Sequence, residues 1–528
     1  MKQYLVTASE MKQYDTNTIQ KYLIPSLILM ERAALVTVEE IHRAWGDGPC
    51  RVLVAAGCGN NGGDGLAIGR ILMSEGYDVT FVLFGDKDKC TEETIRQINI
   101  VREYGAQVFS TMQNGEYDIV IDAVFGIGLS RPVEGICRDA IRWINRIGAK
   151  VCSVDIPSGI RADTGEVMGD AVNADITVTY GFRKLGHMLY PGTIYTGKLI
   201  CRRMGIDERS FLGEEPYWYT HIGRDSRLLP ERRPDGNKGT FGKALLIAGS
   251  DQIAGAAMMA AKSAFRIGTG MVKVITAVEN KENIQQYVPE AMLLTYTKNI
   301  SCRDDADSME RKEFTDRDAF ICELGEAFKW ADSILIGPGI GTGIWARELL
   351  RLCIEESNLP LVIDADGLNL LAQDKELQKS MADRRNQDRV IILTPHLGEF
   401  ARLYGCSVEQ VKGGLTDYPR QLSDRLHCIV VCKDARSVVV WHGGRQGYLN
   451  TTGNAGMATA GSGDVLAGIV TGLLAQKMPG EDAAVTGVYL HGIAGDLAAE
   501  KETETSMTAT DIIDRIRDAI LLQQGKTI

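Results

Sequence analysis

Residues 453–468 read GNAGMATAGSGDVLAG, a glycine-rich turn that runs into an apolar helix. A turn of this kind leaves unpaired backbone N–H groups at the helix N-terminus, where they bind an anion. Asp464 follows the turn, so its carboxylate is placed to take a proton from a hydroxyl group that attacks phosphorus. The simpler alternative is an aspartate that caps the helix. The many small residues beside Asp464 favour the phosphoryl-transfer site.

Four further polar clusters in the second half of the chain each follow a short apolar run. They are GPGIG (337–341), DADG (364–367), TPHLGE (394–399) and Lys433-Asp434. Ligands of open parallel sheets bind outside the carboxyl ends of the strands, where all four clusters are expected. His396 or Lys433 alone would more often be structural, but their shared position favours a site. The Walker sequence GxxxxGK[ST] is absent, which excludes a nucleotide site of the P-loop class.

A second glycine-rich loop, GCGNNGGDG at 57–65, lies in the first half between an apolar run and a helical stretch. It contains the GxGxxG pattern of dinucleotide-binding folds, and Asp86 could then be the ribose-binding acid of a dehydrogenase. Two asparagines and Asp64 crowd the loop, however, and a carboxylate repels a pyrophosphate. Amide and carboxylate oxygens are better suited to an alkali or alkaline-earth cation.

Two more polar loops of the first half follow apolar runs. Asp122 begins DAVFGIG (122–128), and Asp155 and Ser158 belong to VDIPSG (154–159). Either aspartate alone would be interpreted as a turn cap. Together with the loop 57–65, they predict one oxygen-rich crevice at the carboxyl edge of a parallel sheet.

Apolar, β-branched runs alternate with helical stretches along most of the chain, which predicts βαβ units and parallel sheets. We therefore expect an α/β protein with an N-terminal domain over 1–212, a polar linker over 213–237 and a C-terminal domain over 238–528. The charged stretch 297–330 is expected to be a surface excursion. The predicted strands are Arg51–Ala56, Asp78–Phe84, Tyr117–Ala123, Ala149–Asp155 and Ala174–Tyr180, then Lys243–Ala248, Met271–Thr276, Ser333–Ile336, Leu361–Asp364, Val390–Leu393, Cys428–Cys432 and Ser437–Trp441.

The composition of the 528-residue chain is that of an ordinary globular protein, with 45% hydrophobic and 24% charged residues. A net charge of −11 gives no basic surface for nucleic acid. No uninterrupted apolar run reaches the roughly 18 residues of a membrane span, and the polar N-terminus is unlike a signal peptide. The 12 cysteines form no CxxC pair, which indicates reduced thiols and a cytoplasmic protein.

Taken together, these motifs resemble those of the bifunctional NAD(P)H-hydrate repair enzymes, and the resemblance covers nearly the whole chain. The stretches that carry it are GCGNNGGDG (57–65), DAVFGIG (122–128), SVDIPSG with Asp163 and Gly165 (153–165), GKALLIAGS (242–250), GPGIG (337–341), DADGLN (364–369), LTPHLGE (393–399) and GNAGMATAGSGDVLAG (453–468). The resemblance implies a Rossmann-like, three-layer α/β/α epimerase domain, followed by a ribokinase-like α/β dehydratase domain.

For the epimerase domain, the resemblance implies exchange of the R and S forms of hydrated NADH and NADPH. A potassium ion would be held by Asn61, Asp122 and Ser158. Asp155 would transfer the proton. The substrate would be contacted by Asn60, Asn61, Gly62, Gly63, Asp64, Gly126, Ile127, Gly128, Leu129, Ser130, Arg131, Pro132 and Asp155.

For the dehydratase domain, the resemblance implies that Asp464 activates the substrate hydroxyl, which accepts a phosphoryl group from ADP with Mg²⁺. Phosphate then leaves, which regenerates NADH or NADPH and releases AMP. The substrate pocket would be lined by Ala256, Gly339, His396 and Asp464, and the nucleotide held by Lys433, Asp434, Ala435, Arg436, Ser437 and Gly463. Asp434 departs from the glycine usual in the family, which puts the ADP-versus-ATP preference in question. We also expect a homo-oligomer.

Three other interpretations compete with this one. A ribokinase-like small-molecule kinase fused to a regulatory nucleotide-binding domain would share Asp464 but leave the Asn60–Asp64 and Asp155–Ser158 motifs unexplained. A non-catalytic scaffold would not need Asp464, Asp155 and Asp122 together. A dehydrogenase is the weakest of the three, because it leaves the crowded loop 57–65 unexplained.

Overall fold

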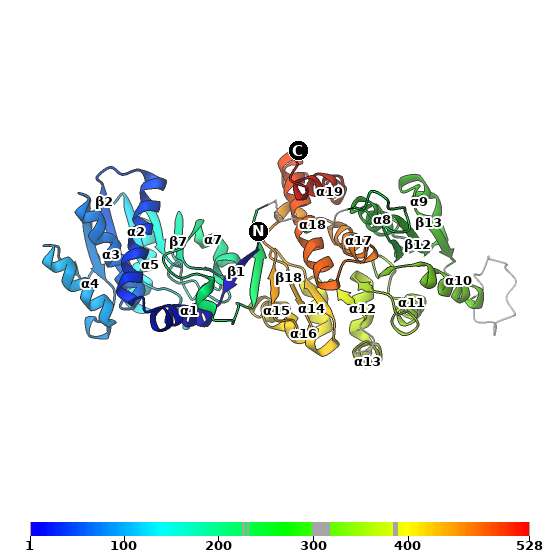
Figure 1. Ribbon diagram of the computed structural model, residues 1–528, viewed down its shortest axis with the longest axis horizontal. Helices are drawn as coiled ribbons and strands as arrows, with labels where there is room; N and C mark the ends of the chain where they lie inside the picture. The colour runs from blue at the N-terminus through cyan, green and yellow to red at the C-terminus, as the bar shows by residue number, and fades with distance from the viewer. Residues whose placement is uncertain (1, 224–227, 230–231, 298–316, 384–388, 527–528) are drawn as a thin grey trace. The chain divides into compact units, whose positions relative to one another are not determined.

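The computed structural model describes residues 2–223, 228–229, 232–297, 317–383 and 389–526 (Figure 1). The chain divides into two compact units, Tyr4–Trp218 and Tyr219–Ile528, the second of which also includes Met1–Gln3. They are called the N-terminal and C-terminal units below. Among the described residues, no helix combines the length and apolar character needed to cross a membrane.

A seven-stranded parallel sheet forms the centre of the N-terminal unit, in the order β4-β3-β2-β5-β6-β7-β9. Its strands are β2 (Arg51–Ala56), β3 (Asp78–Leu83), β4 (Val108–Phe109), β5 (Ile119–Ala123), β6 (Lys150–Val154), β7 (Ile176–Tyr180) and β9 (Lys198–Arg202). The helices are α1 (Ala8–Lys21), α2 (Ser26–Trp45), α3 (Asn60–Ser74), α4 (Glu92–Glu103), α5 (Gly135–Ile147), α6 (Leu185–Met188) and α7 (Gly192–Thr196).

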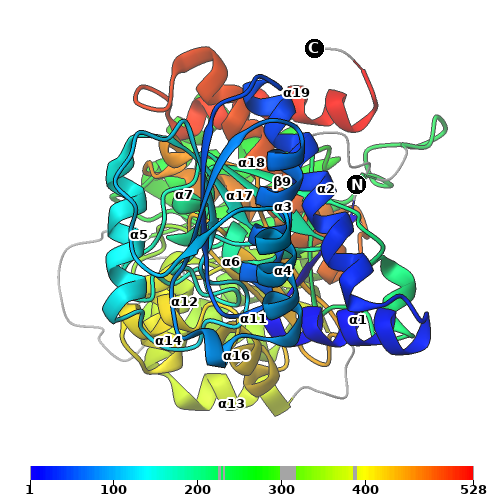
Figure 2. The same ribbon diagram turned by 90° about the vertical axis from the view of Figure 1, so that its left-hand side faces the viewer.

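Helices cover both faces of this sheet, with α5 on one side and α2, α3 and α4 on the other (Figure 2). Successive side chains of a strand point to opposite faces. Val52 and Val54 of β2 therefore pack under α2 to α4, whereas Leu53 and Ala55 pack against α5. This two-sided burial explains why the predicted strands are apolar throughout rather than alternating.

The C-terminal unit is built on a mixed sheet that follows the order β13-β12-β11-β14-β15-β16-β17-β18-β19-β10. The strands are β10 (Trp218–His221), β11 (Lys243–Ile247), β12 (Met271–Ala277), β13 (Met292–Tyr296), β14 (Ser333–Ile336), β15 (Leu361–Ile363), β16 (Ile391–Leu393), β17 (Ile429–Cys432), β18 (Val438–Trp441) and β19 (Gly447–Leu449). Pairing is parallel from β13 to β17 and antiparallel from β17 to β19.

Four helices of the C-terminal unit, α8, α17, α18 and α19, pack on one face of its sheet and form its main core. The helices are α8 (Gly255–Arg266), α9 (Lys281–Tyr287), α10 (Arg317–Trp330), α11 (Ile344–Glu355), α12 (Ala365–Gln373), α13 (Lys375–Asp383), α14 (Leu397–Tyr404), α15 (Val408–Gly413), α16 (Tyr418–Leu426), α17 (Ser462–Ala475), α18 (Gly480–Glu502) and α19 (Ala509–Gln523). Because α17 is apolar on all sides, it lies buried among its neighbours.

Every predicted strand is present, with ends that differ by no more than two residues. Helix α1 begins with a capping box formed by Thr7 and Glu10. Both sheets contain further strands that the sequence did not predict. β9 and β13, which were not predicted, are parallel edge strands. The predicted strand β18 forms a hairpin with β17 because only a short loop separates them.

Two other segments differ from the sequence prediction. The stretch 213–237, expected to be a linker throughout, contains β10, because Trp218 and Thr220 bury their side chains. Within 297–330, residues 298–316 lie outside the described residues, and 317–330 form α10 instead of a surface excursion. That helix buries Phe320, Leu324 and Ala327 beneath its charged face.

The packing of α17 on α8 predicts that Gly468 cannot be replaced without loss of stability. A Cβ at Gly468 would lie 2.1 Å from Ser263 Oγ and 2.2 Å from the carbonyl oxygen of Ala260. Gly468→Ala is therefore expected to destabilise the C-terminal unit by about 2–3 kcal/mol. Gly325→Ala is the matched control, because Gly325 has open space in α10 and alanine favours a helix by about 0.5–1 kcal/mol. Urea denaturation followed by circular dichroism should order the proteins Gly325→Ala, wild type and Gly468→Ala; equal midpoints would contradict the packing.

Candidate active sites

Three polar loops meet at the carboxyl edge of the N-terminal sheet. They follow β2, β5 and β6, which are neighbours in the sheet. Asn60 and Asn61 lie in the first turn of α3, and Asp64 follows that turn, so the predicted loop 57–65 is half turn and half helix. The convergence predicted for the loops beginning at Gly57, Asp122 and Asp155 is therefore confirmed.

Close backbone approach explains the glycines of the first loop. A Cβ at Gly57 would lie 2.0 Å from the carbonyl oxygen of Val124, and one at Gly62 would lie 1.9 Å from that of Gly57. Such contacts exclude every side chain. The two glycines therefore allow the first turn of α3 to pack directly against the segment that follows Asp122.

Asp122 is fully buried and holds the second and third loops together. Its Oδ2 accepts hydrogen bonds from Ser153 Oγ at 2.7 Å and from the backbone N–H of Ser158 at 2.9 Å. Ser158 Oγ in turn accepts from the backbone N–H of Phe125 at 2.8 Å. Burial raises the pKa of Asp122, and the hydrogen bonds from Ser158 and Ser153 oppose that rise. The carboxylate is more than a turn cap, since its partners lie on neighbouring strands and loops.

Asn61 borders this network and supplies the remaining oxygen of the predicted potassium site. A Cβ at Gly126 would lie 3.2 Å from Asn61 Oδ1, so this amide packs against the start of the Gly126–Pro132 loop. Asn61 Nδ2 is buried without a hydrogen-bond partner among the described residues. Amide, hydroxyl and carboxylate oxygens suit a hard cation. The donor set of Asn61, Asp122 and Ser158 therefore fits potassium.

Asp155 lies beside this cluster, in a network that the sequence did not predict. Its Oδ1 accepts hydrogen bonds from Thr179 Oγ1 at 2.9 Å and from the buried ammonium of Lys184. His187 Nε2 lies 2.8 Å from the backbone oxygen of Asp155. Burial by itself raises the pKa of Asp155, but the attraction of Lys184 and its hydrogen bond hold that pKa below the usual value. Lys184 and His187 follow β7 without a glycine-rich motif, so nothing marked them in the sequence.

Two more carboxyl groups face Asp155 from helices. Asp64 projects from α3 and Asp15 from α1, and neither makes a hydrogen bond or ion pair with the described residues. Burial raises the pKa of Asp64 well above its usual value, and repulsion from Asp155 and Asp15 adds to this. The pKa of Asp15 is raised by burial and by Asp155. The crevice thus contains carboxyls whose environments move their pKa values in opposite directions, as in acid–base pairs. Asp15 was not predicted, because it lies inside an ordinary amphipathic helix.

The predicted dehydrogenase alternative is not supported at Asp86. This residue is exposed and caps a short helical turn, with Oδ1 accepting from the N–H of Asp88 at 3.1 Å.

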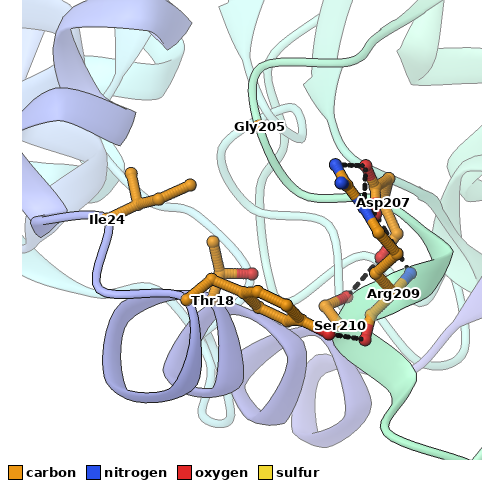
Figure 3. A pocket seen from close by; sticks show the side chains of 7 residues that line it. Thr18, Ile24, Gly205, Asp207, Arg209 and Ser210 are labelled. Carbon is orange, nitrogen blue, oxygen red and sulfur yellow. Dashed lines mark hydrogen bonds and ion pairs between the residues drawn. The ribbon is translucent and has the colours of Figure 1, made fainter.

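A separate hollow of about 220 Å³ lies in the N-terminal unit between α1 and the segment 205–210. Figure 3 shows Arg209 against the carboxylate of Asp207, and the two make a bidentate ion pair. None of the predicted site residues lines this hollow. Its one guanidinium is neutralised by Asp207, so we do not assign the hollow to the active site.

The second site is at the carboxyl edge of the C-terminal sheet. Its loops follow β11, β14, β15, β16 and β17, which are consecutive neighbours. Gly461 takes a left-handed conformation, with φ of 89°, and begins α17. Asp464 projects from the first turn without a hydrogen bond or ion pair to the described residues, and no side chain caps this helix. The alternative in which Asp464 is only a helix cap is therefore wrong.

An ion pair lies beneath the start of α17. Lys433 Nζ donates to Asp364 Oδ1 at 2.8 Å, and Asp364 is almost completely buried. A Cβ at Gly463 would lie 3.2 Å from Lys433 Nζ. Burial alone lowers the pKa of Lys433, but Asp364 and Glu399 raise it above the usual value. A permanently charged ammonium therefore stands directly beside the N–H groups of the 460–464 turn.

The environment of Asp464 raises its pKa into the range in which a carboxyl group can transfer a proton near neutral pH. Burial raises the pKa of Asp464 to about 7, and repulsion from Asp364 adds to the rise, while Lys433 opposes it. A carboxylate with such a pKa can accept a proton from an alcohol and still be ionised at physiological pH.

His396 begins α14 beside this ion pair. Its Nδ1 accepts from the backbone N–H of Gly398 at 3.0 Å, and its Nε2 lies 3.3 Å from Glu399 Oε1. The backbones of His396 and Lys433 form an isolated parallel bridge. Burial and the nearby Lys433 lower the pKa of His396. A neutral, half-exposed imidazole therefore borders the same edge.

Ala256 and Gly339 also lie together. A Cβ at Gly339 would be 3.1 Å from the Cβ of Ala256, and Gly339 has a φ of 65°. The adjacent loop is tied to α12 by a hydrogen bond from the Gly341 N–H to Asp366 Oδ2 at 2.9 Å. Asp366 in turn contributes to the raised pKa of Asp464. The predicted substrate-pocket residues thus belong to the edge that bears Asp464.

The predicted nucleotide loop is the turn of the β17–β18 hairpin. Ser437 Oγ donates to the carbonyl oxygen of Asp434 at 3.3 Å, and Arg436 Nη1 donates to that of Thr451 at 3.2 Å. The side chains of Asp434 and Ala435 are exposed. Asp434 can therefore replace the usual glycine without pointing into the loop.

Two residues of α18, the buried His491 and the partly buried Asp496, support the Gly453–Asp464 segment. His491 Nε2 lies 3.3 Å from Ser462 Oγ, and burial lowers the pKa of His491 to about 4, so that its imidazole is neutral. Asp496 accepts from the backbone N–H of Gly453 at 3.1 Å and from Asn454 Nδ2 at 3.2 Å. The sequence did not predict either residue, because a single polar residue within a long apolar helix has no distinctive pattern.

Each of the two units matches a known protein family. Residues 26–186 match the family described as YjeF-related protein N-terminus, and residues 244–518 match the family described as NAD(P)H-hydrate dehydratase. An ADP/ATP-dependent NAD(P)H-hydrate dehydratase from Bacillus subtilis, co-crystallized with ATP and Mg²⁺, is 26% identical. It covers 55% of this chain and 93% of its own, with a TM-score of 0.44.

The similarity to curated relatives extends over nearly the full length of both chains. The bifunctional NAD(P)H-hydrate repair enzyme Nnr of Thermofilum pendens is 36% identical over 97% of this chain and 95% of its own length. Nnr of Moorella thermoacetica is 33% identical over the same shares, and Nnr of Escherichia coli is 32% identical over 93% of this chain and 88% of its own. The chain therefore belongs to the family of bifunctional NAD(P)H-hydrate repair enzymes.

Proposed function

We propose that the two sites act in sequence on hydrated NADH and NADPH. The N-terminal unit interconverts the R and S epimers, and the C-terminal unit dehydrates the S epimer at the expense of ADP. The observation that carries the proposal is Asp464, a carboxyl with a pKa of about 7 and no hydrogen bond or ion pair to the described residues. It lies beside the Lys433 ammonium and the glycine turn that begins α17.

In the N-terminal site, the reacting carbon of the hydrate bears both a hydroxyl group and a ring nitrogen. Departure of the hydroxyl as water and return of water from the opposite face inverts this carbon. Asp64, whose pKa burial raises well above its usual value, gives a proton to the departing hydroxyl, and ionised Asp155 takes one from the returning water. The α3 turn and the Gly126–Pro132 loop bind the substrate. Asn61, Asp122 and Ser158 would hold potassium, which would supply a fixed positive charge there.

In the C-terminal site, Asp464 removes the proton from the substrate hydroxyl as its oxygen attacks the β-phosphorus of ADP, and AMP leaves. Lys433 and the N–H groups of the 460–464 turn stabilise the charge on the transferred group. Phosphate then departs with a proton from the neighbouring carbon, which restores the dihydronicotinamide ring. The substrate lies along Ala256, Gly339 and His396, and the adenine nucleotide lies along the hairpin turn Lys433–Ser437 and Gly463.

Mg²⁺ is proposed to arrive with the nucleotide and to offset the charge of its phosphates. The described residues contain no group of three His, Cys, Asp or Glu side chains placed to hold a metal. In nucleotide sites, Mg²⁺ is held mainly by phosphate oxygens and water. A cytoplasmic location and a homo-oligomer remain part of the proposal.

The raised pKa of Asp464 predicts that kcat for dehydration depends on pH. Because the ionised carboxylate is the base, kcat should rise with pH and reach half its maximum near pH 7. Asp364→Asn removes a neighbouring negative charge and should move the midpoint to lower pH. Initial rates of NADH formation at 340 nm, with saturating substrate and ADP between pH 6 and 9, measure both. A pH-independent wild-type rate would contradict Asp464 as the base.

Substitution of Asp464 or of Asp155 should each impair only one of the two activities. Asp464→Asn is expected to reduce NADH recovery by at least about a thousandfold while epimer exchange continues. Asp155→Asn should slow exchange and leave the R epimer behind when ADP is supplied. Chromatography of the epimers follows exchange, and absorbance follows recovery. Loss of both activities in both variants would show that the assignment of one reaction to each unit is wrong.

Potassium should act on exchange alone. Replacing K⁺ in the buffer by tetramethylammonium should lower the exchange rate, while recovery of NADH from the S epimer stays unchanged. Ser158→Ala removes one oxygen of the proposed site and should raise the K⁺ concentration needed for half-maximal exchange. An exchange rate that does not depend on K⁺ would disprove the cation site.

A further inference from the structure

Lys184 is a buried lysine at the end of a short strand in the N-terminal unit. It belongs to β8 (Arg183–Lys184), and its side chain is 1% exposed. Its ammonium donates to Asp155 Oδ1, to Thr179 Oγ1 at 2.8 Å and to the carbonyl oxygen of Tyr180 at 3.3 Å. A buried ammonium is stable only when it is paired and hydrogen-bonded. All three protons of this one have acceptors, and Asp155 is its only ionised partner among the described residues.

The contacts on Asp155 are strongly asymmetric. Lys184, Thr179 and the backbone N–H of Tyr180, at 3.4 Å, all donate to Oδ1. Oδ2 accepts no hydrogen bond from the described residues. One oxygen of the carboxylate is thus held by the protein, and the other remains available to a reacting group.

The backbone of Asp155 is fixed as well. Its φ is 64°, in the left-handed region that non-glycine residues rarely adopt. His187 Nε2 bonds to its carbonyl oxygen, and His187 Nδ1 accepts from the backbone N–H of Lys184 at 3.1 Å. One imidazole therefore links the backbones of Asp155 and Lys184. Strained residues that the surroundings hold in place are typical of functional sites.

The segment that carries Lys184 and His187 is itself anchored. β8 pairs with β1 (Lys2–Val6) through Leu5 and Val6. The backbone N–H of Gly186 donates to the carbonyl oxygen of Ala162 at 2.6 Å. A Cβ at Gly186 would lie 2.3 Å from the carbonyl oxygen of Arg161. The lysine is therefore presented by a rigid turn rather than by a mobile loop.

We propose that Lys184 is a positioning residue for the epimerase reaction: it holds Asp155 ionised and turned so that Oδ2 faces the substrate, and His187 fixes the backbone on which both depend. This inference rests on the proposed epimerase function of the N-terminal unit. It adds to that function the group that keeps the base in its working state and orientation.

Of the titratable groups around Asp155, Lys184 supplies the positive charge. Four of these groups are acids, which are neutral when protonated and negative when ionised. They are Asp15 on α1, Asp64 on α3, Tyr180 on β7 and Cys201 on β9. Burial and the nearby Lys184 lower the pKa of His187 to about 3, so its imidazole is neutral at physiological pH. Without the lysine, burial and these acidic neighbours would all favour a protonated Asp155.

Lys184→Met tests the proposal, with epimer exchange measured by chromatography between pH 5 and 9. Its kcat for exchange should fall by about a hundredfold, the loss typical of a displaced reacting group, while KM changes by less than about threefold. The acid limb of the pH profile should move to higher pH by about one unit or more, because Asp155 then protonates more easily. Lys184→Arg restores the charge and should keep the acid limb close to that of the wild type.

Lys198→Met is the matched control, because Lys198 is an exposed lysine on β9 of the same sheet. It should leave kcat and the acid limb unchanged. Dehydration of the S epimer by the same proteins reports whether each chain is folded. Should Lys184→Met fail to fold, Thr179→Val removes a hydroxyl that contacts both Lys184 and Asp155, and it should shift the limb in the same direction by a smaller amount.

The outcomes separate this inference from the function on which it rests. If the wild-type protein does not exchange epimers, the proposed epimerase function fails. If the wild type exchanges them and Lys184→Met or Thr179→Val keeps the wild-type acid limb, Lys184 has no positioning role. A fall in kcat without any shift of the limb would also overturn the proposal, since a purely structural lysine produces that result.

Discussion

The structure depends on parallel strands that are buried on both faces. Such strands must return through crossover helices, and every strand then ends at the same edge of its sheet. In both units, the apolar faces leave this edge as the place where polar loops gather. The loops after β2, β5 and β6 build one site, and those after β11, β14, β15, β16 and β17 build the other. Two different reactions are thus positioned by the same constraint on chain direction.

A lysine paired with an aspartate occurs in both sites, but the two reacting carboxyl groups have opposite pKa shifts. In the N-terminal unit, Lys184 contacts Asp155 itself and lowers the pKa of that carboxyl. In the C-terminal unit, Lys433 is paired with Asp364, and the neighbouring Asp464 keeps a raised pKa of about 7. Removing either lysine would leave an unpaired buried carboxylate, which is far less stable than the pair. The direction of each shift follows from whether the reacting carboxyl or its neighbour holds the cation.

Membership of the family identifies the reaction and its substrate more closely than the geometry of either site alone. An N–H-rich turn with a nearby carboxylate is suited to phosphoryl transfer to many hydroxyl groups. The oxygen-rich crevice of the N-terminal unit is suited to many proton transfers. Their presence in one chain, with 36% identity to Nnr of Thermofilum pendens over nearly the full length, identifies repair of hydrated nicotinamide nucleotides. Asp434, the one departure noted in the nucleotide loop, is exposed, so its side chain does not fill the hairpin turn.

The sequence by itself determined the α/β class, the main strands and the loops with Asp122, Asp155 and Asp464, because strand burial and glycine turns leave short-range patterns. Edge strands such as β13 and the strand β10 were not predictable, since their pairing depends on residues distant in sequence. The tertiary structure alone decided the partners Lys184, His187, Asp15, Asp364 and His491. Each lies on a different element from the residue it acts on, and a pKa depends on distance in space rather than along the chain.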